Sequence, residues 1–136
     1  MMASTDELLD QASLALINAY APYSGLRVGA AVLAASGKIY TGCNVESMAF
    51  PLGGCAEHHA IAAGVRAEGA KFALKEVAVA ARDRQDVAMP IPPCGACRQL
   101  ILEFGADAEV RFLGRTGEIK RLSITALLPE SFVLDT

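Results

Sequence analysis

The sequence predicts an α/β fold in which helices pack on a sheet. Segments with apolar residues at helical spacing alternate along the chain with short, almost wholly apolar runs that are typical of buried strands. The length of 136 residues suits a single domain, residues 1–136, with a core of its own. The chain contains no internal repeat, low-complexity tract or obvious linker, which agrees with one continuous unit.

The first half of the chain predicts a helix, a hairpin and a second helix. Residues 5–19 place leucines and alanines at helical spacing behind a cap at Ser4 or Thr5. Residues 28–34 form an apolar run, and a Ser-Gly turn leads from it into residues 39–42, so the two segments predict paired strands. Residues 44–54 should be irregular, and the alanine-rich residues 55–67 predict a helix that begins on a cysteine.

The second half continues the same alternation. Residues 76–81 predict a buried strand, and three prolines at positions 90, 92 and 93 prevent regular structure after it. Residues 97–104 predict a short helix that ends at Gly105. A further strand is expected at residues 110–113 and a short helix at residues 124–128.

Composition and charge narrow the classes of partner. The net charge of −3 and the lack of a basic run argue against a nucleic-acid partner. No stretch approaches the roughly 18 apolar residues of a membrane span, and acidic residues interrupt any early signal-like run. We therefore expect no membrane partner and a cytoplasmic location. The hydrophobic content of 53% is high for this length, so we expect part of it to lie in a subunit interface.

Two fragments, Cys55-Ala56-Glu57 and Pro93-Cys94-Gly95-Ala96-Cys97, predict a catalytic zinc site. Three cysteines can hold one Zn²⁺ and leave the fourth position open, whereas a structural zinc is normally closed by four protein ligands. A carboxylate two residues after the first ligand can take a proton from the attacking water and pass it to a leaving group. This layout is typical of the zinc nucleobase deaminases.

The predicted helices place both fragments at helix starts, where the partial positive charge favours thiolates. Other interpretations of the cysteines remain open at this point. A structural zinc would take Cys43 as its fourth ligand, although Glu57 would then have no role. The Cys-x-x-Cys pair alone would also fit a thioredoxin-like redox motif, and a secreted chain could form two disulfides.

The sequence also closely resembles the small homotetrameric zinc-dependent cytidine deaminases over nearly its whole length. The resemblance implies a three-layer α/β/α fold with a mixed five-stranded central sheet. It implies hydrolytic deamination of cytidine and deoxycytidine in pyrimidine salvage, with active sites shared between neighbouring subunits. The matching segments are Pro22-Tyr23-Ser24, Val28-Gly29-Ala30-Ala31, Gly42-Cys43-Asn44-Val45-Glu46, Pro51-Leu52-Gly53, Cys55-Ala56-Glu57, Pro92-Pro93-Cys94-Gly95-Ala96-Cys97-Arg98-Gln99, and Leu127-Leu128-Pro129 with Phe132.

By this resemblance, several positions acquire expected roles. Asn44 and Glu46 match the pair that hydrogen-bonds the ribose, and an amide and a carboxylate two residues apart on an extended segment can grip a hydroxyl from one side. The Ala56 backbone and Phe50 match substrate contacts. Phe132 matches an aromatic residue that reaches a neighbour's site. Cys55, Cys94 and Cys97 match the zinc ligands, and Glu57 matches the proton-shuttling acid and base.

Two positions depart from the family pattern and bear on the substrate. His58 stands where the family usually has an arginine, and we expect it to act as a donor to a zinc thiolate. Leu26 stands where many relatives carry a phenylalanine beside the nucleoside, so the pocket is expected to be wider. Two alternatives therefore stay open: a deaminase of a modified aminopyrimidine nucleoside, of the blasticidin-S deaminase kind, and a non-catalytic zinc-stabilised binding module.

Overall fold

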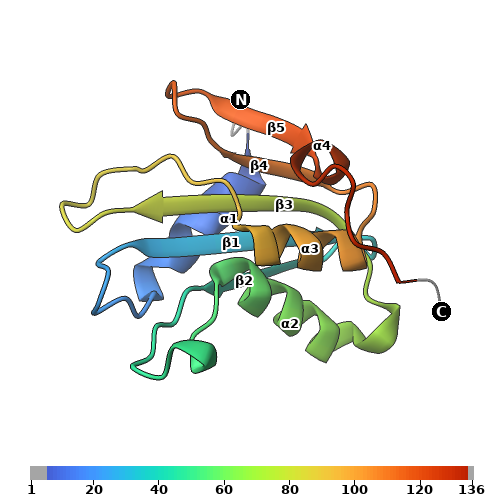
Figure 1. The fold of residues 1–136 in the computed structure, drawn as a ribbon, viewed down its shortest axis with the longest axis horizontal. Helices are drawn as coiled ribbons and strands as arrows, with labels where there is room; N and C mark the ends of the chain where they lie inside the picture. Colours follow the sequence, from blue (N-terminus) through green and yellow to red (C-terminus); the bar gives the residue numbers. More distant parts are fainter. Residues whose placement is uncertain (1–5, 135–136) are drawn as a thin grey trace.

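The computed structural model describes residues 6–134, and its centre is one mixed sheet of five strands (Figure 1). The strand order is β2-β1-β3-β4-β5. The β3–β4 pair is parallel and the other three neighbouring pairs are antiparallel, so the expected mixed five-stranded sheet is confirmed. The strands are β1 (Arg27–Ala34), β2 (Ile39–Cys43), β3 (Leu74–Arg82), β4 (Glu109–Leu113) and β5 (Ile119–Ser123).

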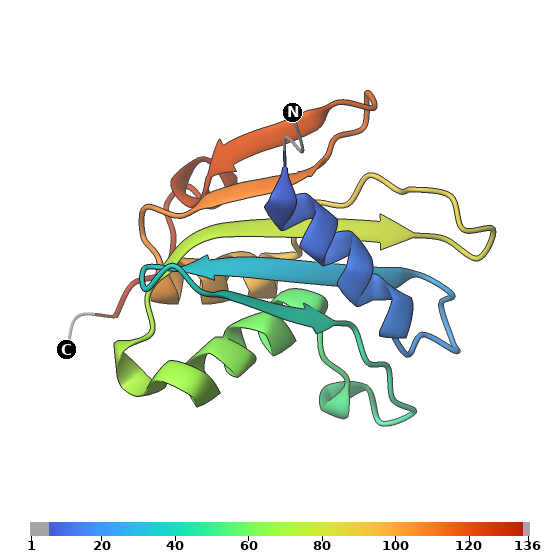
Figure 2. The same ribbon diagram turned by 180° about the vertical axis from the view of Figure 1, so that it is seen from behind.

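The helices complete a three-layer arrangement. Helices α2 (Ala56–Glu68) and α3 (Gly95–Phe104) cover one face of the sheet (Figure 1). Helix α1 (Glu7–Ala15) crosses the opposite face (Figure 2), and the short α4 (Ile124–Leu127) follows β5. The predicted α/β/α layering is therefore confirmed, and α2 and α3 share a face because each connects strands by passing over the same side.

Helix α1 is capped by a residue that the sequence did not single out. The side chain of Asp6 accepts a hydrogen bond from the Leu9 amide at 3.2 Å, which satisfies one of the free N–H groups of the first turn. The caps predicted at Ser4 or Thr5 lie outside the described residues. Leu8 and Ala12 of α1 are buried against Ala31 and Ala78 of the sheet.

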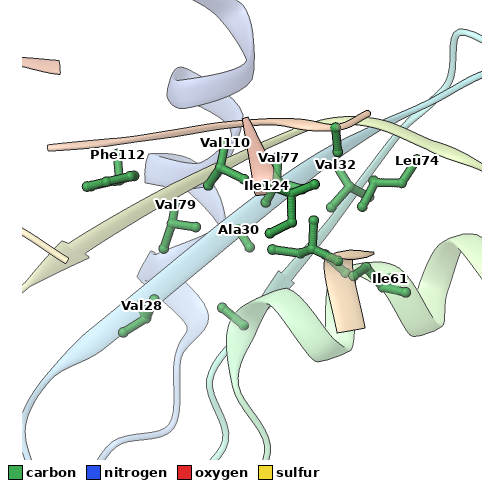
Figure 3. Packing of buried hydrophobic residues seen from close by; sticks show 14 of the residues in the cluster. Val28, Ala30, Val32, Ile61, Leu74, Val77, Val79, Val110, Phe112 and Ile124 are labelled. Carbon is green, nitrogen blue, oxygen red and sulfur yellow. The ribbon is translucent and has the colours of Figure 1, made fainter. Parts of the chain in front are cut away.

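The main core lies between the sheet and the α2–α3 layer. Valines from β1, β3 and β4 form one buried cluster with Ile61 of α2 and Ile124 of α4 (Figure 3). Ile101 of α3 belongs to the same cluster. Gly42 of β2 lets α2 approach the sheet closely, because a Cβ at Gly42 would lie only 2.7 Å from the Ala56 carbonyl oxygen. This contact places the first turn of α2, and with it Cys55 and Glu57, directly against the sheet.

Two element predictions need correction. Strand β5 was not predicted from the residues; all five of its side chains are exposed, so no burial pattern marks it. Helix α3 begins at Gly95 rather than at Cys97, which makes Cys94 the residue that precedes its first turn.

Residues 44–54 are largely irregular, as predicted, apart from a single 3₁₀ turn at Phe50–Leu52 and isolated bridges at Val45. Within residues 6–134, no helix has the length and apolar character needed to cross a membrane.

Candidate active site

A cavity of about 480 Å³ opens beside the starts of α2 and α3. Its wall combines the turn before β1, the segment after β2, the first turn of α2 and the proline segment before α3. Eight residues that the sequence predicted to form the site line this one cavity: Leu26, Asn44, Glu46, Phe50, Cys55, Ala56, Glu57 and Cys94.

Three cysteines gather at the starts of α2 and α3, beside this cavity. The Sγ atoms of Cys55, Cys94 and Cys97 all lie within 4.8 Å of one another, and the Cys55–Cys94 distance is 3.9 Å. Tetrahedral zinc with Zn–S bonds of about 2.3 Å requires sulfur atoms roughly 3.8 Å apart, so the cluster fits the ion. Among the described residues the cluster holds these three ligands and not Cys43, which disfavours the four-cysteine structural site.

The cysteines take their positions from the helix starts. Cys55 immediately precedes α2 and Cys94 immediately precedes α3, and both have extended backbone conformations. The pKa of the Cys55 thiol is lowered to about 6, first by its hydrogen bond with Cys97 and also by the nearby His58 and His59. The pKa of the Cys97 thiol is raised by the same hydrogen bond and by burial. The lowered pKa of Cys55 favours its thiolate, which is the form that binds a metal.

Glu57 is a buried carboxylate beside this cluster. It lies in the first turn of α2, is 4% exposed and reaches the cavity wall. Burial raises the pKa of Glu57 to about 7, because the carboxylate loses its hydration, and hydrogen bonds from its own amide and from Cys97 partly offset this. A carboxyl group with a pKa near neutrality can both accept and donate a proton at physiological pH.

Asn44 is held in place by the backbone at the start of β1. Its Oδ1 accepts a hydrogen bond from the Val28 amide at 2.8 Å, and its Nδ2 donates to the Leu26 carbonyl at 2.9 Å. An amide side chain can accept two hydrogen bonds and donate two, so one acceptor position and one N–H of Asn44, which lines the cavity, are not used by these two bonds.

Glu46 is also held by hydrogen bonds, in its case to the turn at Tyr23 and Ser24. Its Oε1 accepts from the amides of Tyr23 and Ser24 at 2.9 and 3.2 Å, and its Oε2 accepts from the Ser24 hydroxyl at 2.5 Å. The hydrogen bond from Ser24 lowers the pKa of Glu46 below its ordinary value, so the carboxylate is charged at neutral pH. A carboxylate offers about four acceptor positions, so one remains for a ligand hydroxyl.

His58 and His59 differ in their surroundings. The His59 Nδ1 lies 2.7 Å from the Cys43 carbonyl oxygen, and its ring packs against Gly54, so it joins α2 to the end of β2. His58 is exposed and stacks on His59 with ring centroids 5.9 Å apart. Within residues 6–134 it makes no direct hydrogen bond to a cysteine, and its effect on Cys55 is electrostatic.

The remaining predicted residues divide into two groups. Leu26 and Phe50 line the cavity, with Phe50 84% exposed at its mouth. Phe132 is 70% exposed and lies outside the cavity of its own chain. Its carbonyl accepts a hydrogen bond from the Gln99 side chain at 2.9 Å.

Sequence reasoning missed two arginines that organise the site. Arg84 donates to the carbonyls of Tyr23 at 2.8 Å and Ser24 at 3.3 Å, which clamps the turn that Glu46 holds from the other side. Arg98 donates to the carbonyl of Pro93, next to the ligand Cys94. Arg98 stands within the matching Cys-x-x-Cys-Arg-Gln segment, but no local pattern marks Arg84.

Comparison with known proteins agrees with this geometry. Among solved structures, the cytidine deaminase from Burkholderia pseudomallei superimposes with a TM-score of 0.81 and 35% sequence identity, covering 95% of this chain and 99% of the other. A cytidine deaminase of Sporosarcina psychrophila is 39% identical over 132 residues, which span 93% of this chain and 90% of the relative. A probable cytidine deaminase of Dictyostelium discoideum is 41% identical over 129 residues, 93% of this chain and 82% of the relative.

The family-level match covers the metal site itself. The model of the cytidine and deoxycytidylate deaminase zinc-binding region matches residues 2–113, a range that contains Cys55, Glu57, Cys94 and Cys97. The cluster of three cysteines is accordingly the zinc-binding site of this region. With its fold, its ligands and this match in agreement, the chain belongs to the cytidine and deoxycytidylate deaminase family.

Proposed function

We propose that this protein deaminates cytidine and deoxycytidine by zinc-assisted hydrolysis, giving uridine or deoxyuridine and ammonia. The observation that carries the proposal is the position of Glu57, which is buried beside three converging cysteines at the wall of a nucleoside-sized cavity. Full-length relatives named as cytidine deaminases support the choice of substrate.

The chemistry needs one proton carrier, and Glu57 has the required properties. Zinc held by the three cysteines supplies a Lewis acid that lowers the pKa of water. Glu57 accepts a proton from the attacking water and delivers it to N3 of the pyrimidine, while the water oxygen bonds to C4. Glu57 then carries the second water proton to the amino group on C4, and the C–N bond breaks to release ammonia. The carboxyl group of Glu57 passes between both forms during each turnover, and its burial favours the protonated form that donates to the amino group.

The sugar is proposed to bind at Asn44 and Glu46. Each side chain retains one free acceptor position after its hydrogen bonds within the chain, and Asn44 also retains one N–H donor. The backbone at Ala56 and the ring of Phe50 line the same cavity and are proposed to contact the nucleoside. Leu26 faces this cavity from the turn before β1, at a position suited to setting its width.

The substitution Glu57→Gln tests the mechanism. It keeps the size of the side chain but removes proton transfer, so we expect zinc content and fold to be retained and ammonia release from cytidine to fall about 10²–10⁴-fold. The exposed Glu103 on α3 provides a matched control, and Glu103→Gln should leave turnover unchanged. Near-normal turnover in Glu57→Gln would exclude the proposed role.

A substrate panel separates the open alternatives. Ammonia release from cytidine or deoxycytidine supports the main proposal, and release from blasticidin S alone would favour the deaminase of a modified nucleoside. A chain that binds one zinc and releases ammonia from none of these substrates would be a zinc-stabilised binding module.

We also propose that the protein forms a homotetramer with shared active sites in the cytoplasm, where thiols stay reduced. Met48, Phe50 and Leu52 are exposed in the segment after β2, and Phe132, Val133 and Leu134 are exposed near the C-terminal end of the described chain. Such apolar surface is typical of an interface.

Light scattering would measure the subunit number, and mixing two inactive variants would test whether sites are shared. If Phe132 completes a neighbour's site, Glu57→Gln and Phe132→Ala chains should regain part of the activity when assembled together. A monomer with full activity, or a mixture without recovery, would contradict the shared site.

A further inference from the structure

The segment that carries the second pair of zinc ligands has little backbone support of its own. Prolines occupy positions 90, 92 and 93, and a proline has no N–H to donate. Among the described residues, 90–93 lie outside every helix and strand and make no backbone–backbone hydrogen bond. Cys94 directly follows this segment, so its position depends on other contacts.

Arg98, which lies in the first turn of α3, makes the hydrogen bonds that hold this segment. Its Nε donates to the Pro93 carbonyl at 2.8 Å, and its backbone amide donates to the Cys94 carbonyl at 2.9 Å. Pro93 is fully buried, so its carbonyl has little access to water. The peptide groups on both sides of the Cys94 Cα are thus oriented by the same residue.

The same guanidinium reaches the end of α4. Its Nη1 donates to the Leu127 carbonyl at 2.8 Å, one of the helix-end carbonyls that lack a partner within the helix. The planar arginine fork therefore ties two backbone segments that are distant in sequence and fixes each relative to α3. In Figure 1, α4 and the chain after it run beside α3.

We propose that Arg98 is a positioning residue for the zinc site, which holds Cys94 in place through the Pro93 carbonyl. The Sγ atom of Cys94 then lies 3.9 Å from that of Cys55, the separation that tetrahedral zinc requires. Without this support, the proline segment would be free to shift, and part of the zinc-binding energy would go into ordering it. The inference rests on zinc binding by the proposed enzyme, but not on which nucleoside it deaminates.

The test is competition for zinc between the loaded protein and a chelator. Arg98→Met keeps the length of the side chain but leaves the Pro93 carbonyl unpaired. Loss of a partner that orients a metal ligand typically costs about 10–100-fold in metal affinity, and we expect a loss in this range. Arg98→Lys keeps one hydrogen-bond donor but not the planar guanidinium, so we expect it to lose less zinc affinity than Arg98→Met. We also expect Arg98→Lys to fold even if Arg98→Met does not.

Two neighbouring variants control for general loosening of this region. Gln99→Ala removes the hydrogen bond to the Phe132 carbonyl, and Ser123→Ala removes the cap of α4, whose side chain accepts from the Ala126 amide at 3.2 Å. Neither touches Pro93, so both should keep zinc affinity within about threefold of the parent, well short of the expected loss.

The inference would be overturned if Arg98→Met kept a zinc affinity within about threefold of the parent. If Arg98→Met does not fold, the same criterion applies to Arg98→Lys. Equal losses in the control variants would also overturn it, because the effect would then come from the loosened region and not from the Pro93 contact. These outcomes differ from failure of the proposed function, in which the parent itself would hold no zinc or release no ammonia.

Discussion

The close contact between α2 and β2 predicts that a single methyl group at position 42 will damage the active site. A Cβ at Gly42 would lie 2.7 Å from the Ala56 carbonyl oxygen and closer still to the Ala60 amide nitrogen. Ordinary contacts begin at 3.4 Å, and backbone atoms cannot rotate away as a side chain can. In Gly42→Ala the first turns of α2 must therefore move outward by about 1 Å, a displacement that can cost on the order of 100-fold in rate.

This movement would carry Cys55 and Glu57 with it, since they stand on either side of Ala56. We expect kcat for cytidine to fall about 100-fold in Gly42→Ala. Overpacking of this kind should also lower the free energy of unfolding by about 1–3 kcal/mol. Ammonia release measures the first effect and denaturant unfolding the second, with zinc content determined on the same samples.

Gly29→Ala is the matched control, because it creates a similar conflict on the other face of the sheet. A Cβ at Gly29 would lie 2.6 Å from the Leu16 amide nitrogen and closer to the Ala12 carbonyl oxygen. These atoms belong to α1 and the turn after it, which carry no site residue. We expect a comparable loss of stability with activity largely kept. Equal catalytic losses in the two variants would refute the argument that displacement of α2 is the cause.

Three further predictions concern the site itself. In zinc-free protein, the stabilising contribution of Glu57 is complete below its unfolded pKa of 4.5 and is lost as pH rises through about 7. Glu57→Gln should therefore gain about 2.5 kcal/mol relative to the parent between pH 5 and pH 8 in urea unfolding, and parallel pH profiles would contradict burial as the cause. His58→Ala should lower kcat/KM for cytidine more than an exposed substitution elsewhere, because His58 acts electrostatically on the ligand Cys55; an unchanged kcat/KM would make His58 a bystander. Leu26→Phe should narrow the cavity and lower the kcat/KM of bulky aminopyrimidine nucleosides relative to that of cytidine, and an unchanged ratio would show that residue 26 does not set the width.

Three of the four strands that the sequence predicted have buried faces, and the fourth, β2, was predicted from the Ser-Gly turn that joins it to β1. Strand β1 is buried at six of its eight positions, and β3 at five of nine, so both stand out as apolar runs. Strand β5 forms only because β4 offers an edge with which it pairs from Ile119 to Ser123. Its two apolar residues, Ile119 and Leu122, are exposed and fall on opposite faces of the strand, so its sequence carries no burial signal. Only the resemblance to the family implied a fifth strand.

The zinc ligands were predictable because they sit in short motifs, whereas the supports of the site join distant segments. Glu46 and Ser24 are 22 positions apart, and Arg84 and Tyr23 are 61 positions apart. Their hydrogen bonds form when the segments after β2 and β3 meet the turn before β1, and no local pattern encodes this meeting. The sequence therefore suggested Glu46 as a ligand contact and could not reveal that most of its acceptor positions serve the turn.

The negative charge of the three zinc-bound thiolates is compensated by the helix starts around them more than by any one side chain. Three thiolates on Zn²⁺ carry a net charge of −1, which opposes ionisation of water. Cys55 and Cys94 each stand at the start of a helix, and a helix N-terminus carries a partial charge of roughly +0.5. Two such termini converge on the cluster because α2 and α3 cover the same face of the sheet (Figure 1). Unlike a histidine, these charges do not titrate. The two helix starts therefore supply a fixed share of the compensation at every pH, whatever residue stands at position 58.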